Sequence, residues 1–338
     1  MPATIKDIAR MAHVSQSTVS RVLNNSGYVK EDTKKRIEAV IKELNYTPSA
    51  IARSLSKRES NTIGVIVPDI TNSYFGEVIK GISQVADKNN LNIIFYNTDN
   101  SFEKEIKSLN LLKEQRIKGI IMTPGFGADD FDNTYKDIVN TLNCPLILAC
   151  ADVNSIEING VFVDNVKGAY DSVKLLLERG HKKIGILLGP LSSEPMSQRL
   201  EGYKKALLES SVEINESYIF KADFTLENAY DITKEMFDRE DYPTALIVST
   251  NRMTMGVIKA MEECNKKIPG DLAIIAADKN EVFDIFGLNM TYIEESPVEL
   301  GKSSMEMLCE ILEHDITEKV RRVIAPKIII RGSERYEK

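Results

Sequence analysis

Polar side chains at helical spacing near the start of the chain have the chemistry to read DNA bases. Glutamine can pair with adenine and arginine with guanine in the major groove, and hydroxyl groups bind phosphates. One short helix would present on its outer face Gln16, Ser17, Thr18, Ser20 and Arg21. The alternative is an amphipathic helix whose outer face is only solvated.

Metal, redox and catalytic chemistry show no comparable pattern. Four cysteines (Cys144, Cys150, Cys264, Cys309) form no CxxC and three histidines are scattered, so we expect reduced, packed thiols, no metal site and no cofactor. GxGxxG after a strand, GxxxxGK[ST] and GxSxG are all absent from the sequence. A hydrolase on an α/β fold is therefore only a remote alternative, and we expect no enzyme.

The base-reading residues need a rigid support, and the first 45 residues predict three helices. Thr4 can cap a helix with an apolar stripe, Ser15 can cap a second helix over 15–23, and a third covers about 31–44. His13 lies in the turn between the first two helices, where the backbone is often left-handed, and histidine tolerates that region. This pattern predicts a helix-turn-helix.

The charge of the chain is divided unevenly. Residues 1–60 hold 11 Lys+Arg and 6 Asp+Glu, a net of +5, whereas the rest of the 338 residues hold 32 and 44, a net of −12. A basic head on an acidic body indicates that only the head meets a polyanion. No apolar run approaches the ~20 residues of a membrane helix, and no signal-like segment begins the chain, so we expect a cytoplasmic protein with no membrane partner.

From residue 62 onward, short apolar runs alternate with helical stretches. Amphipathic helices are expected over 74–89 and 103–115. Repeated strand–helix units of about thirty residues predict doubly wound parallel sheets. Unbroken β-rich runs, typical of buried parallel strands, occur at 63–67, 92–96, 119–123, 146–150, 184–188, 245–249 and 272–277.

The head resembles the DNA-binding domain of the LacI/GalR family of bacterial repressors. The segments that carry the resemblance are 4–10 (TIKDIAR) and 14–24 (VSQSTVSRVLN). We therefore assign residues 1–47 to an all-α helix-turn-helix domain. The resemblance implies DNA contacts by Thr4, Ser15, Gln16, Ser17, Thr18, Ser20, Arg21 and Asn24.

Residues 45–55 (NYTPSAIARSL) resemble the hinge helix of that family, and we assign 48–61 to hinge and linker. The resemblance implies that 49–56 becomes helical only on operator DNA, with Leu55 wedged into a minor-groove base step and Ala52 and Arg53 alongside. The physics agrees, because a lone eight-residue helix is marginal in water and apolar wedges kink DNA from the minor groove. Packing of Leu55 against the body is the alternative.

Residues 62–338 resemble the periplasmic-binding-protein-like core of the same family, at segments such as 63–70 (IGVIVPDI) and 199–203 (RLEGY). The resemblance implies a two-lobed α/β body that binds an effector and forms the dimer. Lobe one is expected at about 62–160 and 292–322. Lobe two is expected at about 161–291 and 323–338.

Ligands of open α/β sheets lie beyond the carboxyl ends of the strands, which here is the cleft between the lobes. The resemblance implies that Phe224 is a platform for a flat ring or sugar face and that Arg199 binds hydroxyls or carboxylates. It implies that the cleft is also lined by Tyr74, Phe75, Asp99, Asn251 and Asp278. For each residue, packing or capping is the alternative.

Three departures from the family pattern bear on the ligand. Arg252 stands where the family usually has Asp, Lys279 where it usually has Asp or Asn, and Cys150-Ala151 where it often has Asp-Arg. Because neutral sugars are normally held by carboxylates, this exchange favours an anionic ligand, such as a sugar acid or sugar phosphate. The alternative is that these side chains face solvent outside the pocket.

The resemblance as a whole implies a sequence-specific DNA-binding regulator, a repressor, whose operator affinity is controlled by a small effector. Two heads on a palindromic operator require two-fold pairing, and the short tail after Gly332 cannot hold the leucine heptads of tetrameric relatives, so we expect a homodimer. A phosphorylated carrier protein is the alternative partner. An open, poorly formed cleft and a basic first-lobe surface would favour it.

Overall fold

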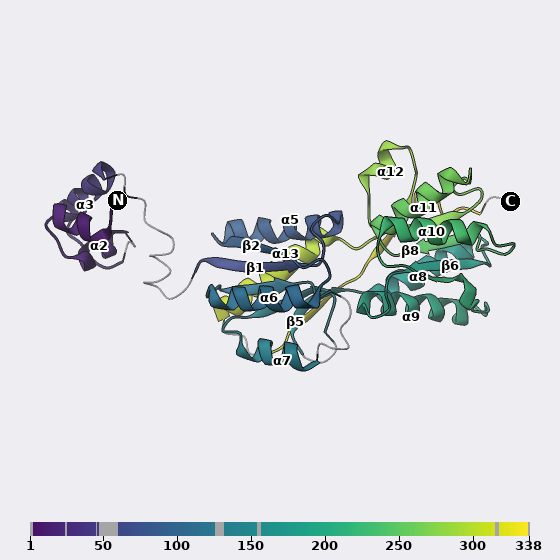
Figure 1. The fold of residues 1–338 in the computed structure, drawn as a ribbon, viewed down its shortest axis with the longest axis horizontal. Helices are drawn as coiled ribbons and strands as arrows, with labels where there is room; N and C mark the ends of the chain where they lie inside the picture. The colour runs from purple at the N-terminus through teal and green to yellow at the C-terminus, as the bar shows by residue number, and fades with distance from the viewer. Residues whose placement is uncertain are drawn as a thin grey trace. The chain divides into compact units, whose positions relative to one another are not determined.

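The computed structural model describes residues 3–23, 26–44, 46, 60–125, 132–153, 157–314 and 318–336. The chain divides into two compact units, Met1–Ser60 and Asn61–Lys338 (Figure 1).

The first unit is the predicted helix-turn-helix head, with helices α1 (Ile5–Met11), α2 (Gln16–Leu23) and α3 (Glu31–Glu43). Thr4 and Asp7 form a reciprocal capping box at the start of α1. The Oγ of Ser15 accepts a hydrogen bond from the backbone N–H of Thr18 at 3.2 Å, which caps α2. His13 adopts φ 51°, the left-handed conformation expected in the turn. The core of the head consists of Ile8, Ala9, Ala12, Val19, Ile37 and Val40.

Lobe one of the body contains a parallel sheet with strand order β11-β5-β4-β3-β1-β2. Its strands are β1 (Thr62–Val67), β2 (Asn92–Asn97), β3 (Gly119–Met122), β4 (Leu146–Cys150), β5 (Asn159–Val163) and β11 (Arg321–Ile324). Its helices are α5 (Ser73–Lys88), α6 (Phe102–Glu114), α7 (Asp132–Thr141) and α13 (Pro297–His314).

Lobe two contains a second sheet with strand order β12-β10-β9-β8-β6-β7, in which β12 runs antiparallel to β10 and the other neighbours are parallel. The strands are β6 (Ile184–Leu188), β7 (Ile219–Lys221), β8 (Ala245–Val248), β9 (Ala273–Ala277), β10 (Thr291–Glu294) and β12 (Lys327–Ile329). The helices are α8 (Asn165–Glu178), α9 (Glu194–Glu209), α10 (Leu226–Phe237), α11 (Asn251–Glu263) and α12 (Glu281–Ile285), with a 3-10 turn at Glu216–Tyr218.

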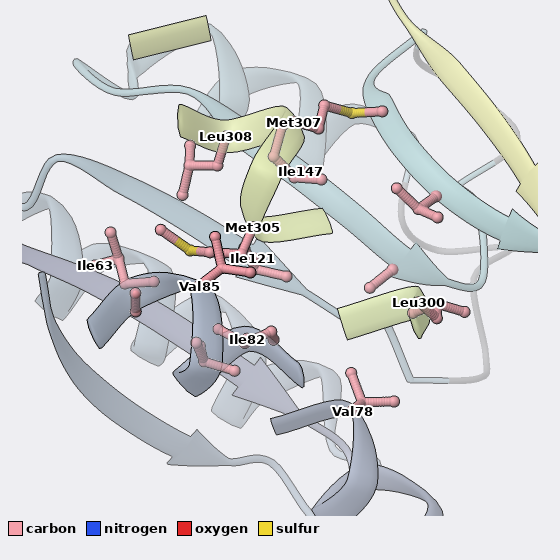
Figure 2. Close-up of a cluster of buried hydrophobic side chains, with 14 of the residues drawn as sticks. Ile63, Val78, Ile82, Val85, Ile121, Ile147, Leu300, Met305, Met307 and Leu308 are labelled. Carbon is pink, nitrogen blue, oxygen red and sulfur yellow. The ribbon is translucent and has the colours of Figure 1, made fainter. Parts of the chain in front are cut away.

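The apolar strand runs are unbroken because both faces of each sheet are covered by helices. In β1, Ile63, Val65 and Val67 join one core cluster with residues of α5 and α13 (Figure 2). Ile66 points to the opposite face and joins a cluster with residues of α6 and α7. Side chains alternate between the two faces of a strand, so a run that is apolar at every position requires a doubly wound sheet. The predicted fold class is confirmed.

The lobe boundaries differ from those expected by a few residues. β5 continues to Val163 within the first sheet, β10 belongs to the second sheet up to Glu294, and β11 returns to the first sheet up to Ile324. The chain crosses between lobes only where a strand has ended, which places the crossings just after these three residues. β2 also differs from the prediction of a buried strand. It is an edge strand, and its Phe95 is exposed.

Candidate functional site

A cleft lies between the two lobes at the carboxyl ends of their strands. It encloses about 940 Å³ of empty space, part of which is open to solvent. Lobe one supplies Pro68, Asp69, Asn72, Tyr74, Phe75, Asn100, Thr123, Pro124, Cys150, Ala151 and Val163. Lobe two and the crossings supply Asn165, Ser193, Pro195, Met196, Arg199, Phe224, Ser249, Thr250, Asn251, Arg252, Ala277, Asp278 and Glu295.

Most of the predicted ligand residues meet in this cleft. The structure brings together Tyr74, Phe75, Arg199, Phe224, Asn251, Arg252 and Asp278. They come from both lobes and from segments that are far apart in the sequence. Their convergence supports ligand binding by these residues. That role itself remains a prediction.

Two predicted residues do not line the cleft. Asp99 forms an ion pair with Lys104 and is bonded by the side chain of Asn97, and the Lys104 hydrogen bond lowers the pKa of its carboxyl. Its neighbour Asn100 lines the cleft in its place. Lys279 is exposed to solvent outside the lining, while the preceding Asp278 is buried. Lys279 therefore fits the alternative given in the sequence analysis, that its side chain faces solvent outside the pocket.

Strained backbone positions mark the ends of the strands that face the cleft. Four lining residues have positive φ, namely Asn100 at 57°, Cys150 at 71°, Phe224 at 71° and Asp278 at 54°. This conformation is uncommon for side chains other than Gly, Asn and Asp, and it is an outlier for a bulky residue such as Phe. Such strain persists where the surrounding structure enforces it and is concentrated at functional sites.

Arg199 is buried, and each of its three guanidinium nitrogens has a hydrogen-bond partner. Its Nε donates to Oδ1 of Asn165 at 2.9 Å, its Nη1 donates to the carbonyl of Ser249, and its Nη2 pairs with the carboxylate of Glu295. Removing either member of such a buried pair leaves an uncompensated charge. Arg199 therefore anchors the cleft floor, and its charge is balanced by the protein itself.

Asp278 is a buried carboxyl that forms no ion pair with any cation in the described ranges. It accepts a hydrogen bond from the backbone N–H of Glu295 at 3.2 Å. Burial raises the pKa of Asp278 well above its usual range, and the nearby Glu295 carboxylate raises it further. A carboxyl in this setting can donate or accept a hydrogen bond to a ligand.

Three buried side-chain atoms in the described part of the chain have no hydrogen-bond partner, and all three belong to cleft residues. They are Oδ1 of Asn100, Oγ of Ser249 and Oδ1 of Asn251. A buried polar atom left unpaired costs free energy of about 1–3 kcal/mol, so each such group in a folded protein requires an explanation. All three belong to residues that would surround a ligand bound in the cleft.

Many lining residues were not predicted from the sequence, and four polar ones among them share a simple signal. Asp69 and Asn100 follow β1 and β2 by two or three residues, and Ser249 and Glu295 follow β8 and β10 directly. The signal is a polar residue within three positions after the end of an apolar strand.

The head presents the predicted DNA-reading residues on the surface. Ser15, Gln16, Ser17 and Arg21 are exposed, and Thr18 and Ser20 are partly so. Ser15 Oγ also bonds the hydroxyls of Ser17 at 2.7 Å and Thr18 at 2.8 Å, which orders the start of α2. Thr4 serves as the cap of α1. The predicted contacts at Asn24, Ala52, Arg53 and Leu55 lie outside the described residues.

No helix in the described ranges is long and apolar enough to cross a bilayer. The same residues contain no group of three or more His, Cys, Asp or Glu side chains placed to hold a metal ion.

Comparisons with known proteins agree with this architecture. Residues 4–49 match the family model "Bacterial regulatory proteins, lacI family", and 173–334 match "Periplasmic binding protein-like domain".

Catabolite control protein A of Priestia megaterium is 32% identical over 323 residues, which cover 94% of this chain and 95% of that protein. The transcriptional repressor PurR of Photobacterium profundum is 31% identical over 98% of each chain. The structure of the lac repressor dimer bound to operator and an anti-inducer superposes with a TM-score of 0.88 at 24% identity, covering 99% of this chain and 100% of that one. The chain belongs to the LacI family of bacterial transcriptional regulators.

Proposed function

We propose that this family member is a DNA-binding transcriptional repressor whose affinity for its operator changes when a small molecule binds in the inter-lobe cleft. The observation that carries the effector part is that the three unpartnered buried polar atoms all line this cleft. A cleft of this kind, mostly pre-formed and with a few convergent polar groups, is typical of small-molecule sites. We place the protein in the cytoplasm, where its DNA would be, and assign it no catalytic role.

The charge of the cleft supports a neutral or donor-rich effector rather than the anionic ligand expected from the sequence. That expectation depended on three cations, Arg199, Arg252 and Lys279. Arg199 is paired with Glu295, Arg252 is paired with Asp69, and Lys279 lies outside the lining. The raised pKa of Asp278 favours its neutral form, so the two ion pairs balance and no lining cation is left without a carboxylate partner for an added anion.

The unpartnered atoms point to the same ligand chemistry. The Oδ1 atoms of Asn100 and Asn251 are acceptors, and the Ser249 hydroxyl can accept as well as donate. The ligand that satisfies them carries hydroxyl or N–H donors, and the aromatic residue Phe224 lines the same cleft. We therefore propose a polyhydroxylated or N–H-bearing ring without negative charge.

A phosphorylated carrier protein is the less favoured partner. Lobe one, taken as residues 61–163 and 296–324, holds 12 Lys+Arg and 19 Asp+Glu, a net of −7. An anionic protein surface would be repelled by this lobe. The cleft also holds buried polar atoms without partners among its lining residues, which favours a small molecule.

The test uses the full chain. Its operator is selected from random double-stranded DNA, and affinity is measured by fluorescence anisotropy in the presence of aldoses, each paired with its acid and its amine. We expect a neutral or amine member to raise Tm and to change operator affinity. Asn251→Ala should abolish both effects, whereas Lys279→Ala should keep them.

Failure to select any preferred duplex would contradict the repressor assignment. Tighter binding of an acid than of its neutral partner would contradict the proposed ligand chemistry while leaving the DNA-binding function intact.

A further inference from the structure

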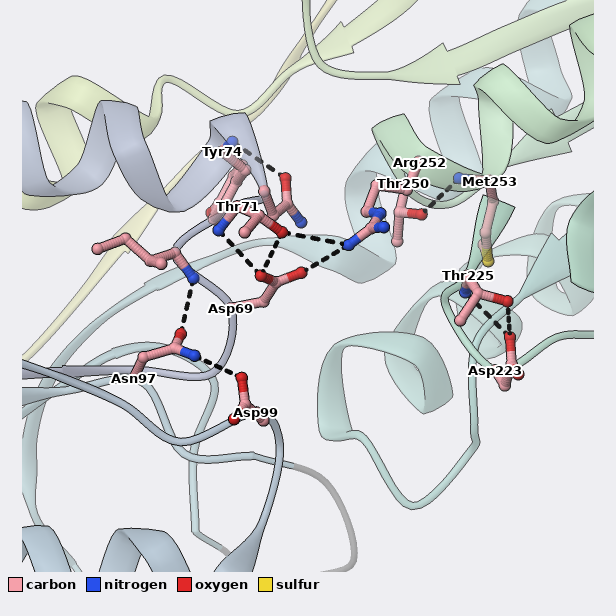
Figure 3. A network of polar contacts seen from close by, with 12 residues as sticks. Asp69, Thr71, Tyr74, Asn97, Asp99, Asp223, Thr225, Thr250, Arg252 and Met253 are labelled. Atoms are coloured by element: carbon pink, nitrogen blue, oxygen red, sulfur yellow. Dashed lines mark hydrogen bonds and ion pairs between the residues drawn. The ribbon is translucent and has the colours of Figure 1, made fainter. Parts of the chain in front are cut away.

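Arg252 of lobe two reaches across the rim of the cleft to lobe one. Its Nη1 lies 2.9 Å from Oδ2 of Asp69 and 3.3 Å from Oγ1 of Thr71 (Figure 3). We propose that this ion pair is a latch that holds the cleft closed without a ligand, so that Arg252 positions the two lobes for effector binding. The effector role of the cleft rests on the proposed function, but the latch itself requires neither effector nor DNA.

Asp69 is held ready for this contact by its own lobe. Its Oδ1 accepts hydrogen bonds from the backbone N–H of Thr71 at 2.9 Å and from the Thr71 hydroxyl at 2.6 Å, which leaves Oδ2 for the guanidinium. Burial opposes ionisation here, but the bonds from Thr71 and Arg252 prevail and lower the pKa of the Asp69 carboxyl. The carboxylate is therefore charged and fixed in direction at neutral pH.

Arg252 occupies a position where its own helix disfavours a cation. It is the second residue of α11, whose N-cap Thr250 accepts a hydrogen bond from the Met253 N–H at 3.2 Å. The N-terminus of a helix carries partial positive charge, and α11 has no acidic residue in its first turn. The compensating negative charge is Asp69, so the electrostatics of α11 are balanced only while the lobes are together.

A second contact joins the lobes elsewhere along the cleft. The carboxylate of Glu194, at the start of α9, accepts a hydrogen bond from the backbone N–H of Asp152, which follows β4. The side chain of Asp152 is itself paired with Arg321 of β11. Among the described residues, these two side-chain contacts bridge the lobes without a ligand.

The expected size of the latch effect is modest but measurable. Arg252 and Asp69 have side-chain exposures of 44% and 27%, and such partly exposed pairs shift an equilibrium by about threefold to fivefold. Open and closed forms of a two-state protein differ by only a few kcal/mol, so a shift of this size changes their populations visibly.

Cys150 provides a readout of opening. It lies on the cleft wall, where its Sγ accepts from the Tyr74 hydroxyl at 3.6 Å and the Thr123 hydroxyl at 3.7 Å. Burial raises the pKa of this thiol to about 12, so alkylation, which requires the thiolate, is slow until the cleft opens.

The experiment measures the rate of N-ethylmaleimide modification of Cys150 in the full chain, by peptide mass spectrometry, without ligand or DNA. We expect Arg252→Asp and Arg252→Gln to accelerate it about threefold to fivefold. The swapped pair Asp69→Arg/Arg252→Asp should be modified at close to the parent rate. The rate for Arg252→Lys should lie between those of the parent and of Arg252→Gln.

Two controls separate a latch from loss of folding. Lys104→Gln removes an ion pair of comparable exposure that lies within lobe one, and should leave the Cys150 rate unchanged. Cys144 and Cys309 report on unfolding, because their exposure does not depend on the cleft. If Arg252→Asp accelerates the modification of every thiol, the parent protein is measured in about 1 M NaCl to distinguish a latch from loss of folding. Salt screens the ion pair, so a latch predicts faster modification of Cys150 but not of Cys144 or Cys309.

An unchanged Cys150 rate in Arg252→Gln, or in the parent at high salt, would overturn the latch. So would a swapped pair that reacts as fast as the single variants. None of these outcomes bears on operator binding, so failure of the latch is distinguishable from failure of the proposed function.

Discussion

At the residue scale, Arg21 is exposed near the end of α2 and forms no ion pair with the described residues. A guanidinium that is free of intramolecular carboxylates is available for a bidentate contact with guanine. We expect Arg21→Ala to cost about 1–3 kcal/mol of binding to the selected operator and much less on random DNA, as measured by anisotropy. Lys35→Ala, an exposed change on α3, is the control. Equal losses on both duplexes for Arg21→Ala would mean that it contacts only phosphate.

Glu105 is a buried carboxyl that the effector hypothesis does not use. It accepts hydrogen bonds from the Tyr135 hydroxyl and the Gly125 N–H, both at 2.5 Å. Burial raises the pKa of Glu105 to about 7 against these bonds, from an ordinary value of 4.5. The folded state therefore holds a proton that the unfolded state loses, so this group makes the protein less stable as pH rises from about 4.5 to 7, with no further loss above.

Replacing this carboxyl by an amide should remove that pH dependence. We expect Glu105→Gln to be more stable than the parent at pH 8 by up to about 3 kcal/mol, and to differ little at pH 5, in urea unfolding of the full chain. Gln keeps an acceptor for the Gly125 N–H. A parent and variant with parallel stability profiles across this range would contradict the assignment.

The cleft residues show how far side-chain roles follow from sequence. Arg199 and Asp278 were predicted to line the cleft from the resemblance to the family, and Asp278 also follows a strand, where ligands of open α/β sheets bind. Asp99 and Lys279 also follow strands but lie outside the lining, where the backbone turns left-handed: Asp99 itself has φ 51°, and Lys279 follows Asp278, which has φ 54°. That turn depends on tertiary contacts and is not encoded in local residue type. The neutralisation of Arg199 by Glu295 joins positions 96 residues apart and is likewise invisible in the sequence.

At the element scale, paired helices approach each other through glycine. A Cβ added to Gly81 of α5 would lie 2.1 Å from the carbonyl oxygen of Val298 in α13, and one on Gly301 would lie 2.0 Å from that of Val78. The same arrangement joins α9 to α8 at Gly202 and α11 to α10 at Gly256. The amphipathic pattern predicted these helices, but not how closely they pack, since that depends on which glycines face a neighbour.

Gly81→Ala should therefore separate α5 from α13 and destabilise lobe one by about 1–3 kcal/mol, measured by urea unfolding. Gly76→Ala is a matched control on the same helix, because nothing lies within 4 Å of its added Cβ. It should be neutral or stabilising by up to about 1 kcal/mol, since alanine is the better helix former. Equal effects of the two substitutions would exclude close packing at Gly81 as the cause.

At the scale of the whole molecule, α12 carries an apolar face that the described residues of this chain do not cover. Val282, Ile285 and Phe286 lie at i, i+3 and i+4, and the last two are 78% and 75% exposed. Exposed apolar side chains that occur singly are normal, but a cluster at helical spacing indicates an interface. The expected homodimer supplies an occupant, because a C2 interface places the same patch of each copy against its partner.

We expect Phe286→Asp to dissociate the dimer, because it buries a charge in an apolar contact. Sedimentation velocity of the full chain at micromolar concentration should show the change from dimer to monomer. Operator affinity should fall steeply at the same time, since two linked heads bind a palindrome with a high effective concentration that a lone head lacks. Leu208→Asp is the control, because Leu208 is 64% exposed on α9 without exposed apolar neighbours on that helix. A Phe286→Asp protein that sediments as a dimer and binds operator as tightly as the Leu208→Asp protein would place the interface elsewhere on the body.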